Sequence, residues 1–241
     1  MAVLSQRTAV ITGASSGIGA AIALCFAREG AKLHLVGRNA VNLEAVAQGA
    51  RKNSPKVLTY QADLSADEDL EKLAAALKRD CDTLDVLIHS AGIIAIGAFE
   101  TASAADFDRQ YRTNVRAPYL LTQALLPMLR AHHGSIVFIN SSVGLTARPN
   151  ISQYCATKHA LKALADSIRA EINSDDVRVL SIYPGRTASP QQAAIHEAEG
   201  KSYRPELLMQ PADVAQILVD ALKVNRTAEV TDISIRPMRK T

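Results

Sequence analysis

The sequence predicts a single α/β domain, residues 1–241, in which a doubly wound parallel sheet of about seven strands carries helices on both faces. Short β-branched or apolar runs alternate with longer segments of helical period along the whole chain, which is typical of such a sheet. Several strand-like runs are almost continuously apolar, as strands buried on both faces are. No internal repeat, low-complexity tract or linker divides the 241 residues.

The strand segments share a short apolar or β-branched core bounded by turn residues. They are RTAVIT (7–12), KLHLVG (32–37), KVLTYQA (56–62), DVLIHS (85–90), SIVFIN (135–140), VRVLSIY (177–183) and EVTDISI (229–235).

The segments between these strands have helical spacing. IGAAIALCFAREG (18–30) ends at Gly30, which is placed to cap the helix. LEKLAAALKRD (70–80) has its leucines and alanines at helical intervals, and 103–131 and 155–172 are long and rich in Ala and Leu. The stretch from Pro184 to Pro211 has little periodicity, and we expect only a short helix there, near QQAAIHEAEG (191–200).

The composition argues against several classes of protein. The net charge of +3 is mild and scattered, and the chain has no Trp, so neither a basic patch nor a base-stacking surface is predicted. No apolar segment is long enough to cross a membrane, and the N-terminus lacks the pattern of a signal peptide. Cys25, Cys81 and Cys155 are odd in number and far apart, which predicts free thiols in the cytoplasm and no metal site.

A glycine-rich turn, TGASSGIG (12–19), follows the first strand and opens an Ala-rich helix. Glycines at such a turn let the backbone approach a pyrophosphate, and the helix N-terminus offers it unpaired N–H groups. The alternative is a tight turn without a ligand, which the position at the start of a doubly wound sheet disfavours. We therefore predict a dinucleotide site whose turn residues are Gly13, Ser15, Ser16, Gly17, Ile18 and Gly19.

The second strand ends in LHLVGRN, so Arg38 stands where dinucleotide folds that select NAD place an acidic residue. No carboxylate is available there to repel a 2′-phosphate, and a guanidinium is suited to pair with it. The alternative is a surface arginine that opens a helix. The pattern favours NADP(H) over NAD(H).

The stretch QYCATK (153–158) places Tyr154 and Lys158 four residues apart, on one face of a helix. Such a pair is often only a surface contact. An ammonium about 4 Å from a phenol would favour the phenolate by up to roughly 4 kcal/mol at an effective dielectric of 20, which is about three pKa units. The pair therefore predicts a tyrosine whose pKa is lowered toward the range useful for acid–base catalysis.

TGASSGIG and YCATK, with the segments between them, resemble the short-chain dehydrogenase/reductase family over nearly the whole chain. The resemblance implies one Rossmann-like domain that binds a nicotinamide cofactor and interconverts carbonyls and alcohols. The catalytic residues that it implies are Asn114, Ser141, Tyr154 and Lys158, with Ser142 as an alternative to Ser141.

The resemblance also implies their roles. Tyr154 would act as the general acid or base, and Ser141 would hydrogen-bond the same substrate oxygen. Lys158 would lower the pKa of Tyr154 and hold the nicotinamide ribose, and Asn114 would anchor a water that relays protons. His89 replaces an asparagine of the family's pattern, and we expect it to be structural. Further cofactor-binding positions carried over from the family are Asp63, Leu64, Ala91, Gly92, Pro184, Gly185, and Thr187 or Ser189.

By the same resemblance, residues 186–210 should form a lid over a small substrate, and the helices of Asn114 and Tyr154 should build a homodimer or homotetramer. The predicted function is an NADP(H)-dependent oxidoreductase of small ketones or aldehydes. The alternatives are a non-catalytic regulator that binds NADPH, and an epimerase or dehydratase that uses the same site.

Overall fold

The computed structural model describes residues 4–239 and contains a seven-stranded, wholly parallel sheet in the order β3-β2-β1-β4-β5-β6-β7. The chain reverses its direction of strand addition between β1 and β4, and ligands of such sheets bind at this point. The predicted fold class and all seven predicted strands are confirmed. The strands are β1 (Thr8–Thr12), β2 (Lys32–Gly37), β3 (Val57–Gln61), β4 (Val86–His89), β5 (Ser135–Ile139), β6 (Arg178–Pro184) and β7 (Asp232–Ile235).

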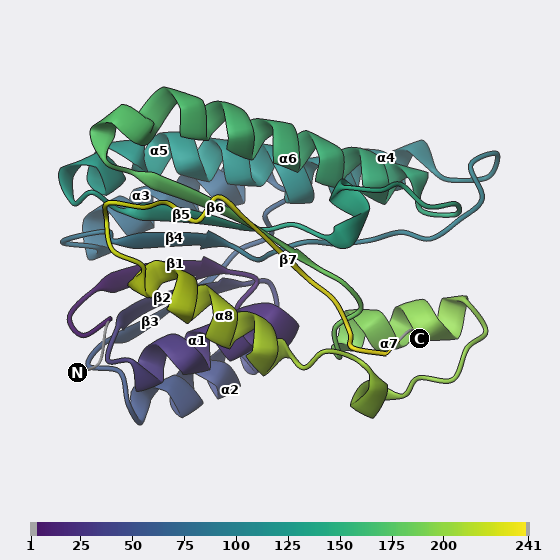
Figure 1. Cartoon of the computed structure of the whole chain (residues 1–241), viewed down its shortest axis with the longest axis horizontal. Coiled ribbons are helices and arrows are strands. Elements are labelled where there is room, and N and C mark those ends of the chain that lie inside the picture. The colour runs from purple at the N-terminus through teal and green to yellow at the C-terminus, as the bar shows by residue number, and fades with distance from the viewer. Residues whose placement is uncertain (1–3, 240–241) are drawn as a thin grey trace.

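Helices cover both faces of the sheet (Figure 1). One layer consists of α1 (Gly17–Arg28), α2 (Ala40–Arg51) and α8 (Pro211–Lys223). The other consists of α3 (Asp67–Asp80), α4 (Ala104–Tyr111), α5 (Ala117–Ala131) and α6 (Ser152–Ile172). The predicted short helix is confirmed as α7 (Pro190–Ala198), which lies beyond the carboxyl ends of the strands, at the right of Figure 1.

Each face of the sheet has its own apolar core. On β1, Ala9 and Ile11 pack with α1, α2 and α8, whereas Val10 between them packs with α3, α5 and α6. Alternate side chains of a strand point to opposite faces, so a strand between two helical layers needs apolar residues throughout. This explains the continuous apolar runs of the sequence.

The end of α1 confirms the predicted cap. Gly30 has a φ of +77°, and the N–H of Ala31 donates to the carbonyl of Phe26 at 3.1 Å. A left-handed glycine followed by this bond forms a Schellman motif, which turns the chain directly into β2.

The long helix expected over 103–131 is interrupted. Between α4 and α5 lies a π-helical turn, Arg112–Arg116, in which the N–H of Ala117 donates to the carbonyl of Arg112. Such turns insert one residue into a helix and are frequent at functional sites. Asn114 lies in this turn and is fully buried.

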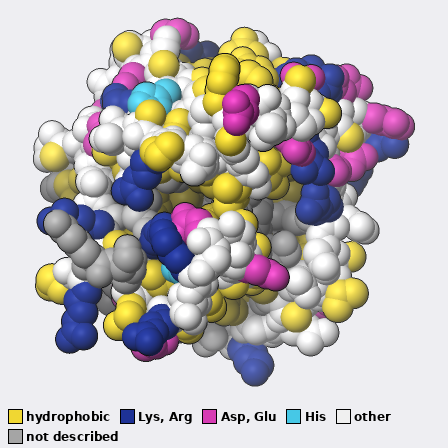
Figure 2. All heavy atoms as spheres, turned by 90° about the vertical axis from the view of Figure 1, so that its right-hand side faces the viewer, with side chains coloured by type: hydrophobic (Ala, Val, Ile, Leu, Met, Phe, Trp, Pro, Cys, Tyr) yellow, Lys and Arg dark blue, Asp and Glu magenta, His cyan; other side chains and the backbone are white. Residues whose placement is uncertain are grey.

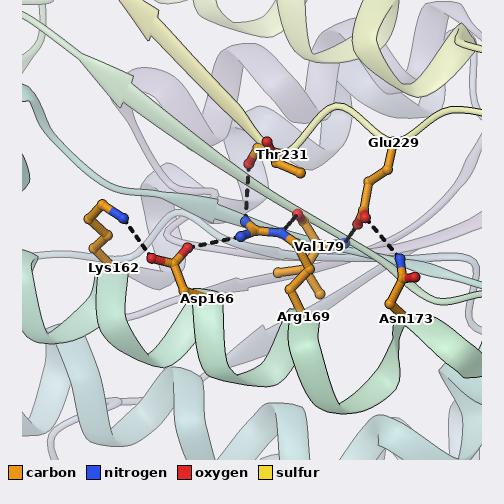
Figure 3. A network of polar contacts seen from close by, with 7 residues as sticks. All are labelled: Lys162, Asp166, Arg169, Asn173, Val179, Glu229 and Thr231. Carbon is orange, nitrogen blue, oxygen red and sulfur yellow. Dashed lines mark hydrogen bonds and ion pairs between the residues drawn. The ribbon is translucent and has the colours of Figure 1, made fainter.

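Side chains from α6 and from the segment before β7 complete the sheet edge where β7 is too short (Figure 3). Pairing of β6 with β7 begins at Ser181 and Asp232, so the backbone of Val179 has no strand partner on that side. The carboxylate of Glu229 accepts from the Val179 N–H at 2.7 Å, and Arg169 Nε donates to the Val179 carbonyl at 2.9 Å. The network thereby ties the C-terminal half of α6 to the edge of the sheet.

We expect Arg169→Ala to lower the free energy of unfolding by roughly 1.5–3 kcal/mol, because it leaves a buried carbonyl without its charged donor. Arg169 also donates to Asp166 at 2.8 Å and to the Thr231 carbonyl at 3.1 Å. Urea denaturation measures the loss. Arg130→Ala is the matched control, because Arg130 makes one exposed ion pair, with Asp175, and should cost less than about 1 kcal/mol. Equal losses in both variants would contradict this role.

Within residues 4–239, no helix is both long and apolar enough to cross a membrane. Over the same range, no three His, Cys, Asp or Glu side chains are grouped to hold a metal ion. Cys25, Cys81 and Cys155 are buried free thiols, as predicted.

Candidate active site

The predicted site residues lie along the carboxyl ends of the strands, most of them at β1, β4, β5 and β6 and the remaining ones after β2 and β3. Figure 2 shows this side of the molecule, with a depression near its middle and Lys and Arg side chains around it. Close approaches link the loops that form it. A Cβ on Gly13 would lie 2.7 Å from Ala91 Cα, and one on Gly92 would lie 3.7 Å from Lys158 Nζ. Loops far apart in sequence therefore share one site.

Tyr154 and Lys158 lie in the first two turns of α6 and face the same way. Lys158 Nζ is 5.7 Å from the centroid of the Tyr154 ring, and it donates to the Ile139 carbonyl at 3.0 Å. Lys158 is 3% exposed, whereas Tyr154 is partly open to the site. The pair is therefore not a surface contact, because the lysine is held beneath the tyrosine.

Ser141 follows β5 and lies near Tyr154. Its hydroxyl lies close enough to the phenol to lower the pKa of Tyr154, and it also accepts from the Val143 N–H at 3.4 Å. Ser142 begins a short 3₁₀ turn, Ser142–Gly144. Of the two serines that the sequence leaves open, Ser141 is the one that the structure brings to the tyrosine.

Burial raises the pKa of Tyr154 to about 12, and the hydrogen bond from Ser141 offsets only part of this rise. The prediction that Lys158 brings this pKa down toward neutrality is therefore wrong for this structure. Burial of the phenol outweighs the effect of the Lys158 ammonium, which donates to the Ile139 carbonyl and lies 5.7 Å from the centroid of the ring. Tyr154 consequently keeps its proton throughout the neutral pH range.

Burial also lowers the pKa of Lys158, to about 8. An ammonium carries three N–H donors, and the described contacts of Lys158 occupy one of them. Two donors remain to bind ligand oxygens inside the site, which fits the predicted contact with ribose hydroxyls.

Asn114 organises the loop that follows β4. Its Oδ1 accepts from the Ile93 N–H, and its Nδ2 donates to the Ile93 carbonyl, both at 2.9 Å. Nδ2 also donates to Thr157 Oγ1 at 3.1 Å. Both N–H groups of the side chain are thus occupied, and the backbone carbonyl of Asn114 is a further acceptor suited to an anchored water. Pro118, four residues on, has no N–H to offer that carbonyl.

Two further positioning residues are not predicted from the sequence. Asn140 is buried, accepts from the Ser141 N–H at 2.9 Å and donates to the Lys158 carbonyl at 3.1 Å. Thr12 Oγ1 accepts from the N–H groups of Ser90 and Ala91 at 3.1 and 3.2 Å. Both residues are polar and end an apolar strand segment of the sequence, and this pattern could have identified them.

The glycine turn is built as predicted. Gly13 and Gly17 have φ values of +69° and +55°, and a Cβ on Gly19 would lie 2.3 Å from the Gly13 carbonyl oxygen. Ser16 is the N-cap of α1, yet its side chain caps no N–H group. Ser15 packs against Gly37 at the end of β2. Ile18 packs against the core below the turn. The free N–H groups at this helix end fit a pyrophosphate.

Arg38 is exposed just after β2, and its carbonyl accepts from Gln61 Nε2 at 3.2 Å. Asp63 lies nearby. Burial raises the pKa of Asp63, but hydrogen bonds from the N–H and hydroxyl of Ser65, with the charge of Arg38, hold it below its usual value. Leu64 is buried behind it. An exposed guanidinium and an ionised carboxylate thus flank the expected adenosine end.

The segment after β6 lies on the other side of the site. Pro184, the last residue of β6, is buried, and Gly185 packs against Pro237, where a Cβ would be 3.0 Å from Pro237 Cδ. Thr187 is buried and donates to the Gly185 carbonyl at 3.1 Å. Ser189 caps α7 and approaches Gly17 of the glycine turn, where a Cβ would lie 3.4 Å away. Of the two predicted hydroxyls, Ser189 is therefore the one beside the glycine turn.

The segment 186–210 contains its own polar contacts. Arg186 donates to both carboxylate oxygens of Glu199, at 2.9 and 2.8 Å, and Lys201 binds the same carboxylate at 2.8 Å. His196 is buried, lies 3.3 Å from Arg186 and packs edge-on against Tyr203. The charged side chains of Arg186, Glu199 and Lys201 therefore pair with one another within the segment.

His89 has the structural role expected of it. It is buried, bonds Thr122 Oγ1 through Nε2 at 2.9 Å and stacks on Phe138 at 5.1 Å. Burial lowers the pKa of His89 to about 3, so the ring is neutral.

Comparison with known proteins agrees with this arrangement. A family model described as short chain dehydrogenase matches residues 7–200. An uncharacterised oxidoreductase of Staphylococcus aureus is 31% identical over 239 residues, 99% of this chain and 100% of that protein.

Two solved structures are also similar. An alcohol dehydrogenase of Thermococcus sibiricus, complexed with 5-hydroxy-NADP, has a TM-score of 0.87 at 27% identity and covers 98% of this chain and 99% of that one. L-sorbose reductase of Gluconobacter frateurii, complexed with NADPH and L-sorbose, has a TM-score of 0.89 at 26% identity and covers 100% and 99%. This chain therefore belongs to the short-chain dehydrogenase/reductase family, whose members are oxidoreductases that act on alcohols and carbonyls with NAD(P).

Proposed function

We propose that this protein is an NADP(H)-dependent reductase of small ketones or aldehydes. The observation that carries the proposal is the cluster of Ser141, Tyr154 and Lys158, in which a partly buried phenol keeps its proton beside a hydrogen-bonding hydroxyl. The cofactor, when bound, supplies the hydride. The protein must then orient the carbonyl, stabilise the charge that develops on its oxygen and deliver a proton.

Tyr154 delivers the proton. Its raised pKa keeps the phenol neutral, and an alkoxide forming on the substrate is a much stronger base than a phenolate, so the transfer is downhill. Ser141 donates a hydrogen bond to the same oxygen, as a donor of an oxyanion hole does. Lys158 holds its charge below the ring and stabilises the phenolate that remains, and the backbone carbonyl of Asn114 is suited to a water that returns the proton.

The state of Lys158 predicts how activity depends on pH. With its pKa lowered to about 8, the ammonium is lost as pH rises through 8, while Tyr154 stays protonated until about pH 12. We expect kcat/KM for carbonyl reduction, which reports the free enzyme, to be level near pH 7 and to fall above pH 8. Lys158→Arg, which stays charged, should remove that fall. A wild-type profile that stays level to pH 10 would contradict this role.

The preference for NADP(H) rests on Arg38, which is exposed and close to Asp63. It is supported by two structural relatives that carry NADPH or an NADP derivative. A guanidinium binds a phosphate dianion through paired hydrogen bonds, each charge-assisted bond being worth about 1.5–3 kcal/mol.

We therefore expect Arg38→Asp to lower kcat/KM with NADPH by about 10²-fold or more, because it replaces a charge-assisted contact by repulsion. The efficiency with NADH should change little or rise. The ratio of the two efficiencies, measured with one carbonyl substrate, is the readout. Arg28→Asp, in the last turn of α1, is the control for an added acidic residue. Preference of the wild type for NADH would refute the assignment.

The proposed reaction is tested by following NADPH consumption with a panel of small ketones and aldehydes. Stoichiometric oxidation of NADPH with one of them supports the reductase. Binding of NADPH without consumption would favour the regulator, and conversion of a substrate at constant NADPH would favour the epimerase or dehydratase.

A homodimer or homotetramer also forms part of the proposal. Phe107, Tyr111 and Tyr119 are 39%, 47% and 45% exposed along α4 and α5, and exposed large apolar groups that cluster on one surface mark interfaces. Light scattering of the pure protein measures the oligomeric state.

A further inference from the structure

A second buried amide lies one helical turn before Asn114. Gln110, near the end of α4, is 1% exposed. Its Oε1 accepts from the Ala95 N–H at 3.2 Å, and its Nε2 donates to Gln153 Oε1 at 2.9 Å. A buried amide is costly unless both of its ends are hydrogen-bonded, and here each end binds a different segment of the proposed active site. Gln110 therefore joins α4 both to the loop after β4 and to the start of α6.

The contacts of Gln110 repeat those of Asn114. Asn114 binds the backbone of Ile93 and the side chain of Thr157. The two partners of Gln110 lie two residues further along the same loop and four residues earlier on α6. The spacings on the two helices match, since residues four apart share one face of a helix. Two amides on one helix thus hold the same loop against the same neighbouring helix.

The orientation of the amides is fixed by the two ends of this chain of hydrogen bonds. The Ala95 N–H can only donate, so the oxygen of the Gln110 amide must face it. The Gln110 nitrogen then faces the oxygen of Gln153, and the Gln153 nitrogen donates to the Ser103 carbonyl at 2.8 Å. The four residues Ala95, Gln110, Gln153 and Ser103, here called the amide clamp, therefore form one directed chain from a backbone donor to a backbone acceptor.

The amide clamp ends beside Tyr154. α6 begins at Ser152, and its N-cap residue, Ile151, has no polar side chain that could bind the N–H groups of the first turn. Tyr154 is the third residue of that turn. A helix end without such a cap is less firmly held. Gln153, the residue before Tyr154, instead ties this turn to α4 through its side chain.

We infer that Gln110 and Gln153 are positioning residues for the proton transfer from Tyr154. The inference rests on the proposed reductase function, which assigns the proton to this phenol. A general acid must lie within hydrogen-bond reach of the oxygen that it protonates, and a displacement of about 1 Å can cost about 10²-fold in rate. By holding the first turn of α6 against α4, the amide clamp keeps the phenol in place beside Ser141. The two amides act through Tyr154 and take no part in the chemistry themselves.

Gln110→Met and Gln153→Met test this role, since each removes an amide and keeps an unbranched side chain of similar length. We expect each variant to lower kcat for NADPH-dependent carbonyl reduction by about tenfold or more. The Kd for NADPH, from fluorescence titration, should stay within about twofold of wild type, and turnover is counted per NADPH-binding site so that unfolded protein does not contribute. Gln123→Met on α5 is the matched control, because Gln123 is exposed and its amide binds the Tyr119 hydroxyl outside the clamp. It should keep the wild-type kcat.

The two amides should also behave as one link. In the double variant, kcat should fall little further than in either single variant, because both substitutions remove the same contact. Losses that multiply would contradict a shared clamp. Arg169→Ala loosens the C-terminal half of the same helix and should leave kcat per NADPH-binding site unchanged. A loss there equal to that of Gln110→Met would mean that general destabilisation of α6, and not positioning, lowers the rate.

Amide hydrogen exchange separates the failure of this inference from the failure of the proposed function. The Ala95 N–H donates to Gln110, so we expect it to exchange at least about tenfold faster in Gln110→Met. Unchanged exchange would show that the clamp does not hold the loop. Unchanged kcat in both single variants of an active reductase would overturn the positioning role alone. A wild type that reduces no carbonyl of the panel would instead refute the proposed function, and the positioning role with it.

Discussion

Tyr154→Phe is expected to lower kcat for carbonyl reduction by about 10²–10⁴-fold, the usual contribution of a general acid. The substitution removes one oxygen and keeps the ring, which lies over Lys158 at 5.7 Å. Because the phenol takes no part in the glycine turn, the affinity for NADPH, measured by fluorescence titration, should stay within about twofold of wild type. Retention of more than a few per cent of the wild-type activity would mean that another group supplies the proton.

The two adjacent serines provide a matched control for this result. Ser141→Ala should lower kcat by about 10²–10³-fold, as loss of one oxyanion-hole donor does. Ser142→Ala makes the same chemical change one residue further on, in the 3₁₀ turn, and should leave kcat nearly unchanged. A larger loss of kcat in Ser142→Ala than in Ser141→Ala would mean that Ser142 donates the hydrogen bond to the substrate oxygen.

Gly13→Ala is expected to have the largest effect on stability, lowering the free energy of unfolding by about 2–5 kcal/mol. Its φ of +69° penalises any side chain, by about 1–2 kcal/mol. The new Cβ would in addition lie 2.7 Å from the backbone of Ala91, and overpacking of this kind adds about 1–3 kcal/mol.

Gly200→Ala separates the cost of a side chain on a left-handed backbone from the cost of the steric contact. Gly200 has a similar φ of +65°, but nothing lies within 4 Å of a Cβ there. Its loss in urea denaturation should therefore be limited to the backbone term of about 1–2 kcal/mol. Equal losses in Gly13→Ala and Gly200→Ala would show that the contact with Ala91 contributes nothing. Weaker NADPH binding by Gly13→Ala is also expected, because the turn must move to relieve the contact.

Local chemistry explains why some features could be predicted from the sequence. The strands are visible because burial on both faces demands continuous apolar runs. The glycine turn is visible because only glycine tolerates both the left-handed backbone at Gly13 and the close approach at Gly19. The spacing of Tyr154 and Lys158 places both on one helix face, whatever packs around them.

Other features of the structure cannot be predicted from local sequence patterns. The π-helical turn at Asn114 adds a single residue to a helix, and one residue does not disturb a periodic pattern enough to be seen. The contacts of Asn140 join residues 18 positions apart, and those of Thr12 join residues nearly 80 apart. Such pairings are made by the order of strands in the sheet.

The sequence by itself determined the parallel sheet, the glycine turn and the proposed catalytic set of Tyr154 and Lys158, since each depends on residue types at short, regular spacings. Only the tertiary structure decided the ionisation of that set. Whether Lys158 lowers the pKa of Tyr154 depends on where its ammonium points and on how much water the packed loops exclude. Ile139, brought beside α6 by β5, takes the hydrogen bond of Lys158, and burial then leaves Tyr154 as a proton donor rather than a ready base.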